Sequence, residues 1–389
     1  MVAFKLAFRN LIGAGLRTWL NVIVLSFAFF IIIFLNGIID GWNRQAKKDT
    51  MNWETGNGQL WHKDFDRYDP YTFQDAHAPV TDDIMLLVKS NMLTPVLVTQ
   101  ATIYPQGRME SIILKGIDPA QKILTLPTNF LVPAGDDIPA IIGKRMASST
   151  NLKKDDLLVV RWRDKNGTFD AVELLIAGIF DCNVPTVDNG QVWIALDELQ
   201  KMTGLENEAS FFIVGKSYPG GDYAGWKYKD SKFLLSDLDK IVRSKKIGQS
   251  IIYLLLLFLA LLAIFDTQVL SIFRRQKEIG TYIALGMTRY QVVGIFTVEG
   301  AAHSIFAIIF GAIYGIPFLL FLNNTGIPMP AAGGQMGISI AEKIFPFYSL
   351  GLIIFSVLLV VLTATLVSYL PAKRIARMNP TDALKGKLL

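Results

Sequence analysis

Residues that commonly carry out chemistry are sparse in this sequence of 389 residues. Its three histidines are His62, His77 and His303, and none has the H-E-x-x-H spacing that places two imidazoles on one helix face to bind a metal ion. The single cysteine, Cys182, can form neither an intramolecular disulfide nor a dithiol redox pair. We therefore expect no metal site, and we interpret Cys182 as a small buried side chain.

The sequence also lacks the loop that binds nucleotide phosphates, G-x-x-x-x-G-K-[ST]. Gly215 and Lys216 are followed by Ser217, but the position that needs the first glycine is Ser210. No G-x-S-x-G turn for a nucleophilic serine occurs. The residues of a hydrolase triad meet only in the fold, but nothing in this sequence supports one. We expect no catalytic residues and no cofactor bound by this chain.

Long apolar stretches dominate the sequence. At about 1.5 Å per residue, four of them are long enough to cross a bilayer core of about 30 Å. These four cover residues 18–40, 247–273, 292–322 and 345–370. A cleaved signal peptide is the alternative for the first, but this stretch exceeds a typical signal core and no A-x-A-like site follows it. The sequence predicts four transmembrane helices.

Basic residues are concentrated in particular segments beside these helices. Lys and Arg precede the first helix and are frequent in 274–291 and 371–389, whereas the 323–344 loop contains only Lys343. Because basic flanks tend to remain in the cytoplasm, both termini and the 274–291 segment are predicted to be cytoplasmic. Residues 41–246 and the 323–344 loop are then predicted to be extracytoplasmic.

The predicted outer segment, 41–246, has a different composition from the rest. It holds 25 Lys and Arg against 27 Asp and Glu, so the positive charge of the chain belongs to its membrane part. This distribution argues against a nucleic-acid-binding face. Short β-rich runs between Gly-containing turns alternate with helical patterns, which predicts an α+β domain. We expect strands at 157–163, 172–180, 192–195 and 211–214, and helices at 84–92 and 197–203. Residues 53–79 are rich in Trp, Tyr, His and Asp and have weak periodicity, so we interpret them as a loop-rich subdomain with undefined boundaries.

Polar residues inside the apolar helices are functional candidates, because a charge in hydrocarbon is costly unless it is paired or hydrated. Asp266 lies in the second predicted helix, and Glu299 and His303 lie one turn apart on one face of the third. Hydrogen bonding between helices is one interpretation of these residues, and a proton relay is the other. Gly311 and Gly315 form a G-x-x-x-G pair that favours close helix packing.

Three stretches outside the apolar helices carry a family resemblance. They are Ala7-Phe-Arg-Asn-Leu11 with Leu16-Arg-Thr18, Arg275-Gln-Lys-Glu-Ile-Gly280 with Ala284-Leu-Gly286, and Pro371-Ala-Lys-Arg374 with Asn379-Pro-Thr-Asp-Ala-Leu384. The chain resembles ABC-transporter permeases of the class that includes the lipoprotein-releasing permeases, the macrolide exporters and the cell-division permease. In this class the three stretches resemble a cytoplasmic amphipathic helix, here 1–17, a coupling segment, here 274–291, and a C-terminal signature in the tail, 371–389.

The resemblance implies a permease of the bacterial inner membrane that is not itself an enzyme. A separate cytoplasmic ABC ATPase would bind ATP and Mg²⁺, and a second permease subunit, identical or homologous, would complete the transporter. We expect Glu278, Gly280, Gly286 and Arg289 to form the surface that couples the permease to the ATPase. Relatives often have Asn at the position of Asp266, so a special role of this residue stays open.

The outer segment narrows the expected function. Three of its stretches resemble lipoprotein-releasing permeases: Thr55-Gly-Asn-Gly-Gln59, Gly116-Ile-Asp-Pro119 and Ile142-Gly-Lys-Arg-Met-Ala147. This implies extraction or export of a lipophilic substrate, with lipoprotein as the first candidate, and a lipoprotein or a periplasmic carrier as a further partner. Two alternatives stay open: mechanotransmission to a cell-wall hydrolase or a sensor, and efflux of drugs or peptides with an outer-membrane channel.

Overall fold

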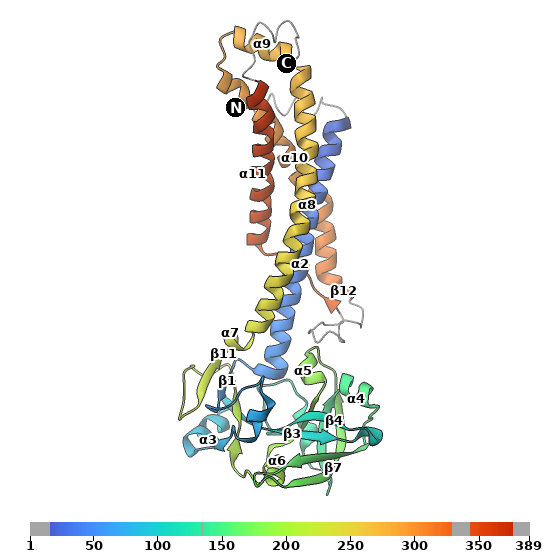
Figure 1. The fold of residues 1–389 in the computed structure, drawn as a ribbon, viewed down its shortest axis with the longest axis vertical. Helices are drawn as coiled ribbons and strands as arrows, with labels where there is room; N and C mark the ends of the chain where they lie inside the picture. The colour runs from blue at the N-terminus through green and yellow to red at the C-terminus, as the bar shows by residue number, and fades with distance from the viewer. Residues whose placement is uncertain (1–15, 134, 329–342, 376–389) are drawn as a thin grey trace. The chain divides into compact units, whose positions relative to one another are not determined.

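A computed structural model describes residues 16–133, 135–328 and 343–375. Contacts divide the chain into two compact units (Figure 1). The described part of the helical unit comprises residues up to Trp42, Ile241–Ile327 and residues from Ile344, and the outer unit contains Asn43–Lys240. Most of the predicted helix 1–17, residues 329–342 of the predicted loop and the tail beyond residue 375 lie outside the described residues.

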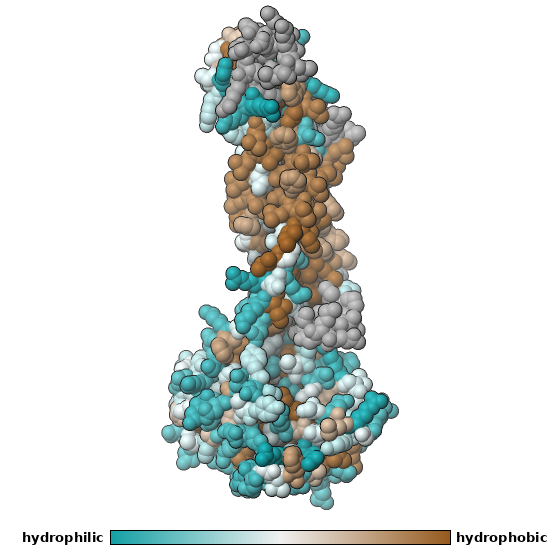
Figure 2. All heavy atoms as spheres, in the orientation of Figure 1, coloured by the Kyte–Doolittle hydropathy of each residue, from teal (hydrophilic) through white to brown (hydrophobic). Residues whose placement is uncertain are grey.

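Four helices in the described chain are long and apolar enough to cross a membrane, which confirms the predicted number. They are α2 (Leu16–Thr50), α8 (Ser236–Arg274), α10 (Arg289–Thr325) and α11 (Leu350–Ile375). A short helix, α9 (Gln276–Ala284), connects α8 to α10. Two short strands, β12 (Ile327–Pro328) and β13 (Lys343–Ile344), pair between α10 and α11. Apolar residues cover the four long helices, whereas polar residues dominate the surface of the outer unit (Figure 2).

Helices α2 and α8 are longer than the apolar runs from which they were predicted. Helix α2 continues through Thr50 into a π-helical turn, η1 (Met51–Thr55), and α8 begins at Ser236. The chain turns out of helix only at Gly56, whose φ of +61° suits glycine. The prediction ended the first helix where charged residues begin, but Lys and Asp are compatible with a helix outside lipid.

Small residues bring the four long helices into close contact. In the third predicted transmembrane helix, Gly311 faces Ser26 and Phe29 of α2, and Gly315 faces Phe30. Gly300, on the same helix, faces Ser368 of α11 and Gln268 of α8. A Cβ atom at Gly300 would overlap the Ser368 side chain and lie 3.2 Å from the Gln268 amide nitrogen. Three helices therefore meet at one glycine.

The outer unit is built on one nine-stranded sheet in the order β11-β1-β10-β3-β4-β8-β5-β7-β6. Its strands are β1 (Gly58–Trp61), β3 (Leu93–Ile103), β4 (Glu110–Ile117), β5 (Ile138–Gly143), β6 (Leu157–Arg163), β7 (Phe169–Phe180), β8 (Gln191–Ala195), β10 (Phe211–Val214) and β11 (Lys227–Asp230). A separate pair joins β2 (Ala78–Pro79) to β9 (Glu208–Ala209). Helices α3 (Asp82–Lys89), α4 (Lys144–Thr150), α5 (Pro185–Asp188), α6 (Leu196–Thr203) and α7 (Ser231–Leu234) connect the strands, with 3-10 turns η2 (Pro70–Gln74), η3 (Pro105–Gly107) and η4 (Thr128–Leu131). The α+β prediction is confirmed.

Six of the nine strands close into a barrel. The long strand β3 pairs with β4 along most of its length and with β6 at its end, where Ala101 faces Trp162 and Ile103 faces Val160. The ring β3-β4-β8-β5-β7-β6 is therefore continuous. Along β6, exposed and buried residues alternate strictly, and the buried ones, Leu158, Val160 and Trp162, belong to one apolar cluster with residues from the other five strands. The barrel interior is a packed core.

Residues 53–79 were interpreted as a loop-rich subdomain with undefined boundaries. They contain η1, β1, η2 and β2, and β1 pairs with both β10 and β11. The aromatic side chains Trp61, Phe65 and Phe73 lie in the same apolar cluster as Trp193 of the barrel strand β8. This region is therefore part of the outer unit and not a subdomain, because its aromatic residues are buried on the common sheet.

The close approach at Gly300 yields a prediction. Gly300→Ala should destabilise the protein by about 1–3 kcal/mol, because the added methyl group has no space beside Ser368. Gly294→Ala is the matched control on the same helix, since no atom lies within 4 Å of its added Cβ. Thermal unfolding in detergent micelles measures both. Equal melting temperatures for the two variants would contradict the proposed packing.

Candidate functional site

The α9 helix packs against the ends of the neighbouring long helices. Ile279 is buried, and Tyr282 and Ile283 lie beside it on the apolar face of α9. This face contacts a cluster that includes Val292 and Phe296 of α10, together with Ile272 of α8 and Ala372 of α11. The spacing of residues 279, 282 and 283 is typical of one face of an amphipathic helix. Apolar burial therefore holds one side of α9 and leaves the opposite side exposed.

Local sequence determines the turn between α9 and α10. Gly286 has φ +97°, a left-handed conformation that glycine adopts without the cost of a Cβ atom. Thr288 caps α10: its hydroxyl accepts a hydrogen bond from the Gln291 backbone N–H at 3.3 Å. In return, the Gln291 side-chain oxygen accepts from the Thr288 N–H at 2.9 Å. This reciprocal capping box fixes where α10 begins.

Arg275 is the centre of the polar contacts at α9. Its Nη1 donates to both carboxylate oxygens of Glu299 on α10, at 2.8 and 3.1 Å, and its Nε donates to Glu278 of α9 at 2.7 Å. The guanidinium also lies over the Phe296 ring, 5.0 Å from its centroid. The Glu299 side chain is only 10% exposed, whereas Glu278 is 52% exposed. The strongest constraint is therefore the contact between Arg275 and the buried Glu299.

The protonation of Arg275 supports this contact. Burial by itself lowers the pKa of the guanidinium, but the hydrogen bonds and charges of Glu278 and Glu299 more than compensate and raise the Arg275 pKa above its usual value. Arg275 therefore stays charged at every physiological pH. A planar guanidinium can bind two carboxylates at once with fixed geometry, which a lysine cannot reproduce.

His303 and Asn21 make polar contacts within the helix bundle. His303 is buried, and its Nδ1 lies 3.1 Å from the backbone oxygen of Glu299, one turn earlier. Asn21 of α2 donates to the Thr267 hydroxyl at 2.5 Å and to the Ala263 carbonyl at 3.2 Å, both on α8. These contacts favour the interpretation of hydrogen bonding between and within helices over a proton relay.

The four residues predicted for coupling are placed differently. Glu278, Gly286 and Arg289 are exposed, whereas Gly280 is buried on the packed face of α9. Gly280 therefore lies on the face of α9 that packs against the long helices, and sequence spacing alone did not show which face this is. Asp266 is exposed on α8, and no hydrogen bond or ion pair joins it to another described residue.

Several residues of the site were missed. Leu285 is 78% exposed and Tyr290 is 83% exposed, on either side of Gly286. Together with Lys277, Glu278, Thr281 and Arg289, they form the exposed side of this region, called here the α9 surface. Leu285 and Tyr290 could have been predicted from the sequence, because they are large apolar residues within a polar turn. Arg275 was recognised only as part of a motif, although its spacing to Glu278 suits an i, i+3 ion pair.

The α9 surface has the character of a protein-docking site. It combines exposed apolar side chains with both signs of charge on a helix and turn that are fixed from behind. Among the described residues, no group of three His, Cys, Asp or Glu side chains could hold a metal ion.

Comparisons with known proteins find similarity to permeases. Residues 250–380 match the family model for the C-terminal region of FtsX-like permeases. The chain is 22% identical to the macrolide export ATP-binding/permease protein MacB of Wolinella succinogenes over 250 residues, which cover 64% of this chain and 34% of that protein. It is 26% identical over 220 residues to an uncharacterized ABC transporter permease of Methanocaldococcus jannaschii, covering 51% of this chain and 52% of that one. The chain thus spans about a third and about half of the length of these two relatives.

The geometry at Arg275 predicts that its contact with Glu299 contributes more to stability than its contact with Glu278. Arg275→Met should destabilise the protein by about 3–5 kcal/mol, because it leaves the Glu299 carboxylate buried without a counter-charge. Glu278→Gln should cost less than about 1 kcal/mol, since this pair is half exposed. Thermal unfolding in detergent measures both.

The double variant Arg275→Met, Glu299→Leu is the control for this experiment. It should recover most of the stability lost in Arg275→Met, because no buried charge is left unpaired. A double variant as unstable as the single one would show that Arg275 acts through packing and not through Glu299.

Proposed function

We propose that this chain, which carries an FtsX-like permease region and is related to ABC transporter permeases, is the permease subunit of an ABC transporter. In this proposal a separate cytoplasmic ATPase docks on the α9 surface and binds the ATP and Mg²⁺ of the transporter. The observation that carries the proposal is the exposed α9 surface. The contact between Arg275 and Glu299 holds the α9 helix, on the side opposite this surface, to α10. Movement of a docked partner would pass through this contact to the long helices.

The distribution of charge supports the orientation of the proposed subunit in a bacterial inner membrane. Basic residues flank α9 and both ends of the chain, so these segments face the cytoplasm in the proposal. The outer unit, whose basic and acidic residues nearly balance, then lies in the periplasm. ATP is available only on the cytoplasmic side, which is the side of the α9 surface.

A lipophilic substrate, most plausibly a lipoprotein, fits the apolar exposed faces of two long helices. Leu20 and Phe27 of α2 are 50% and 55% exposed, and Leu255 and Phe258 of α8 are about equally exposed at 60% and 61%. Acyl chains can move along such faces without leaving an apolar environment. The stretches of the outer unit that resemble lipoprotein-releasing permeases support the same substrate class.

Export of a small lipophilic compound is the second candidate. The specific observation in its favour is the similarity to a protein named for macrolide export. The two candidates share one mechanism, in which ATP hydrolysis by the partner drives movements of the permease, and they differ only in the cargo.

The proposed docking predicts that the α9 surface controls ATPase coupling. Glu278→Lys combined with Leu285→Asp should abolish stimulation of the partner ATPase by the permease, because both the charge and the apolar contact are lost. Hydrolysis by the reconstituted complex in nanodiscs measures the effect. Lys154→Gln, on the exposed surface of the outer unit, is the control. Unchanged stimulation in the double variant would refute docking at this surface.

The cargo is identified by affinity purification from native membranes, with mass spectrometry of the proteins and lipids retained. Recovery of an ATPase with lipoproteins supports lipoprotein extraction. Recovery of an ATPase without lipoproteins, together with macrolide sensitivity of a separate strain that lacks this chain, supports export. Recovery of an ATPase with a cell-wall hydrolase points to mechanotransmission. No ATPase at all would refute the permease proposal.

We also propose that a second permease subunit covers the face of α8 that bears Asp266. This residue lies eight positions before Arg274, about 12 Å along the helix, and it is exposed in the isolated chain. A carboxylate at such a depth costs roughly 2.5–3.5 kcal/mol in lipid. Contact with a partner subunit, or a water-filled space between two subunits, removes this cost.

Cysteine cross-linking tests this pairing. Asp266→Cys should form a cross-linked dimer with a short bifunctional thiol reagent, whereas Leu366→Cys, 65% exposed on α11, should not. The native Cys182 does not interfere, because it is buried and burial raises the pKa of its thiol to about 12. Cross-linking to a different subunit identifies a heteromeric pair by mass, and no cross-link at position 266 contradicts the pairing.

A further inference from the structure

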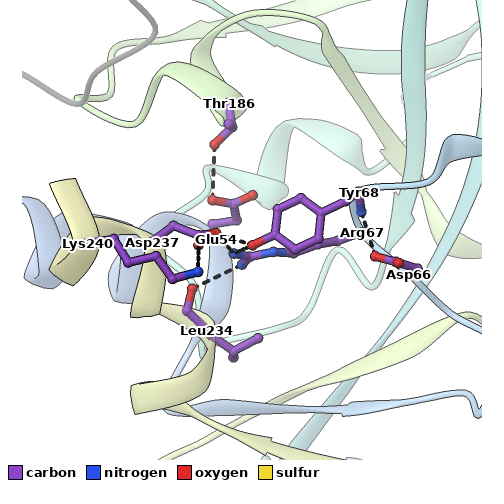
Figure 3. Close-up of polar contacts among 8 residues, drawn as sticks. All are labelled: Glu54, Asp66, Arg67, Tyr68, Thr186, Leu234, Asp237 and Lys240. Atoms are coloured by element: carbon purple, nitrogen blue, oxygen red, sulfur yellow. Dashed lines mark hydrogen bonds and ion pairs between the residues drawn. The ribbon is translucent and has the colours of Figure 1, made fainter.

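The outer unit contains a polar network where α8 begins (Figure 3). Arg67 lies in the loop between β1 and η2, and its Nη1 donates to the Leu234 carbonyl at the end of α7, at 3.1 Å. Its Nη2 pairs with the Asp237 carboxylate in the first turn of α8, at 2.9 Å. The Tyr68 hydroxyl donates to the same carboxylate, and Lys240 binds its other oxygen at 3.0 Å. One arginine thus contacts both the end of α7 and the start of α8.

The end of α2 carries a charge that acts on this network. Glu54, in the π-helical turn that ends α2, accepts a hydrogen bond from the Thr186 hydroxyl at 3.1 Å. Burial by itself lowers the pKa of Arg67, but its contact with Tyr68 and the charge of Glu54 are among the causes that raise it overall. Lys47 of α2 pairs with Asp239 of α8 at 2.5 Å. Charges of opposite sign therefore alternate from the end of α2, through Arg67, to the first turn of α8.

Aromatic contacts hold the adjacent segment independently of these charges. Phe233 of α7 packs edge to face against Trp61 of β1, with ring centroids 5.9 Å apart. Lys229 of β11 lies over the Phe233 ring, 4.7 Å from its centroid. The aromatic contact resists separation of α7 from β1. A guanidinium fork between a carbonyl and a carboxylate is directional and therefore fixes the rotation of the first turn of α8.

We infer that Arg67 is a positioning residue that fastens the first turn of α8 to the sheet of the outer unit. Movement of α8 is then transmitted to β1 through the loop that carries Arg67, and the outer unit follows the helix. The consequence for transport rests on the proposed function, whereas the fastening itself does not. Asp237 and Asp239 also favour this position because carboxylates at a helix N-terminus interact well with the helix dipole.

Hydrogen exchange tests the fastening without any partner. In the full chain in nanodiscs, Arg67→Gln should increase amide exchange of residues 231–246 by about tenfold, the effect expected when hydrogen bonds to a charged group are lost. Arg108→Gln, on an exposed loop of the same unit, is the matched control. Equal exchange in Arg67→Gln and Arg108→Gln overturns the inference.

A second measurement separates positioning from a merely structural role. With the partner ATPase bound, Arg67→Gln should keep basal ATP hydrolysis and lose most substrate movement, and Arg67→Lys should recover part of it. If Arg67→Gln increases amide exchange but leaves substrate movement unchanged, Arg67 does not transmit the movement of α8 to the outer unit. If no ATPase binds the wild-type chain, the proposed function fails, while the exchange experiment still decides whether Arg67 fastens α8. Membrane level and melting temperature identify a variant that fails to fold, in which case Asp237→Asn replaces it.

Discussion

The structure depends most on one electrostatic requirement: the Glu299 carboxylate, inside an apolar helix, needs a permanent counter-charge. Arg275 supplies it and cannot lose its proton at any physiological pH. Because Arg275 lies directly between α8 and α9, satisfying Glu299 also determines how α9 leaves α8 and which side it presents. Neutralising one buried charge on α10 thus acts together with the apolar packing of Ile279 to orient the α9 surface.

Polar side chains are placed differently in the helical unit and in the outer unit. In the helical unit, polar side chains are buried between helices, and small residues such as Gly300 and Ser368 allow the approach that brings their partners within reach. In the outer unit, ion pairs such as that of Arg67 with Asp237 are partly exposed and therefore add little stability. These ion pairs act through their geometry, because a directional contact fixes the rotation of a helix about its own axis.

Local patterns predicted four of the nine strands of the sheet, β6, β7, β8 and β10. The strands at 157–163 and 211–214 were located to the residue, because alternation along β6 and turn residues beside β10 mark their ends. The barrel was not predictable in the same way. It closes through the pairing of Ala101 with Trp162, some 60 residues apart, and nothing in either strand identifies the other as its partner. The lengths of α2 and α8 were underestimated because an apolar run indicates the part of a helix that contacts lipid, whereas the helix itself can continue into water.

For the candidate site, sequence by itself determined the four apolar helices, the position of the segment between α8 and α10 and the glycine that turns it. Residue type and short-range spacing suffice for these, because hydropathy and backbone preference act within a few residues. Only the tertiary structure decided that Gly280 is buried, that Arg275 pairs with Glu299 across 24 positions and that Arg67 reaches Asp237 across 170. Such contacts depend on which faces of distant elements meet, and that choice is made by the packing of the whole chain.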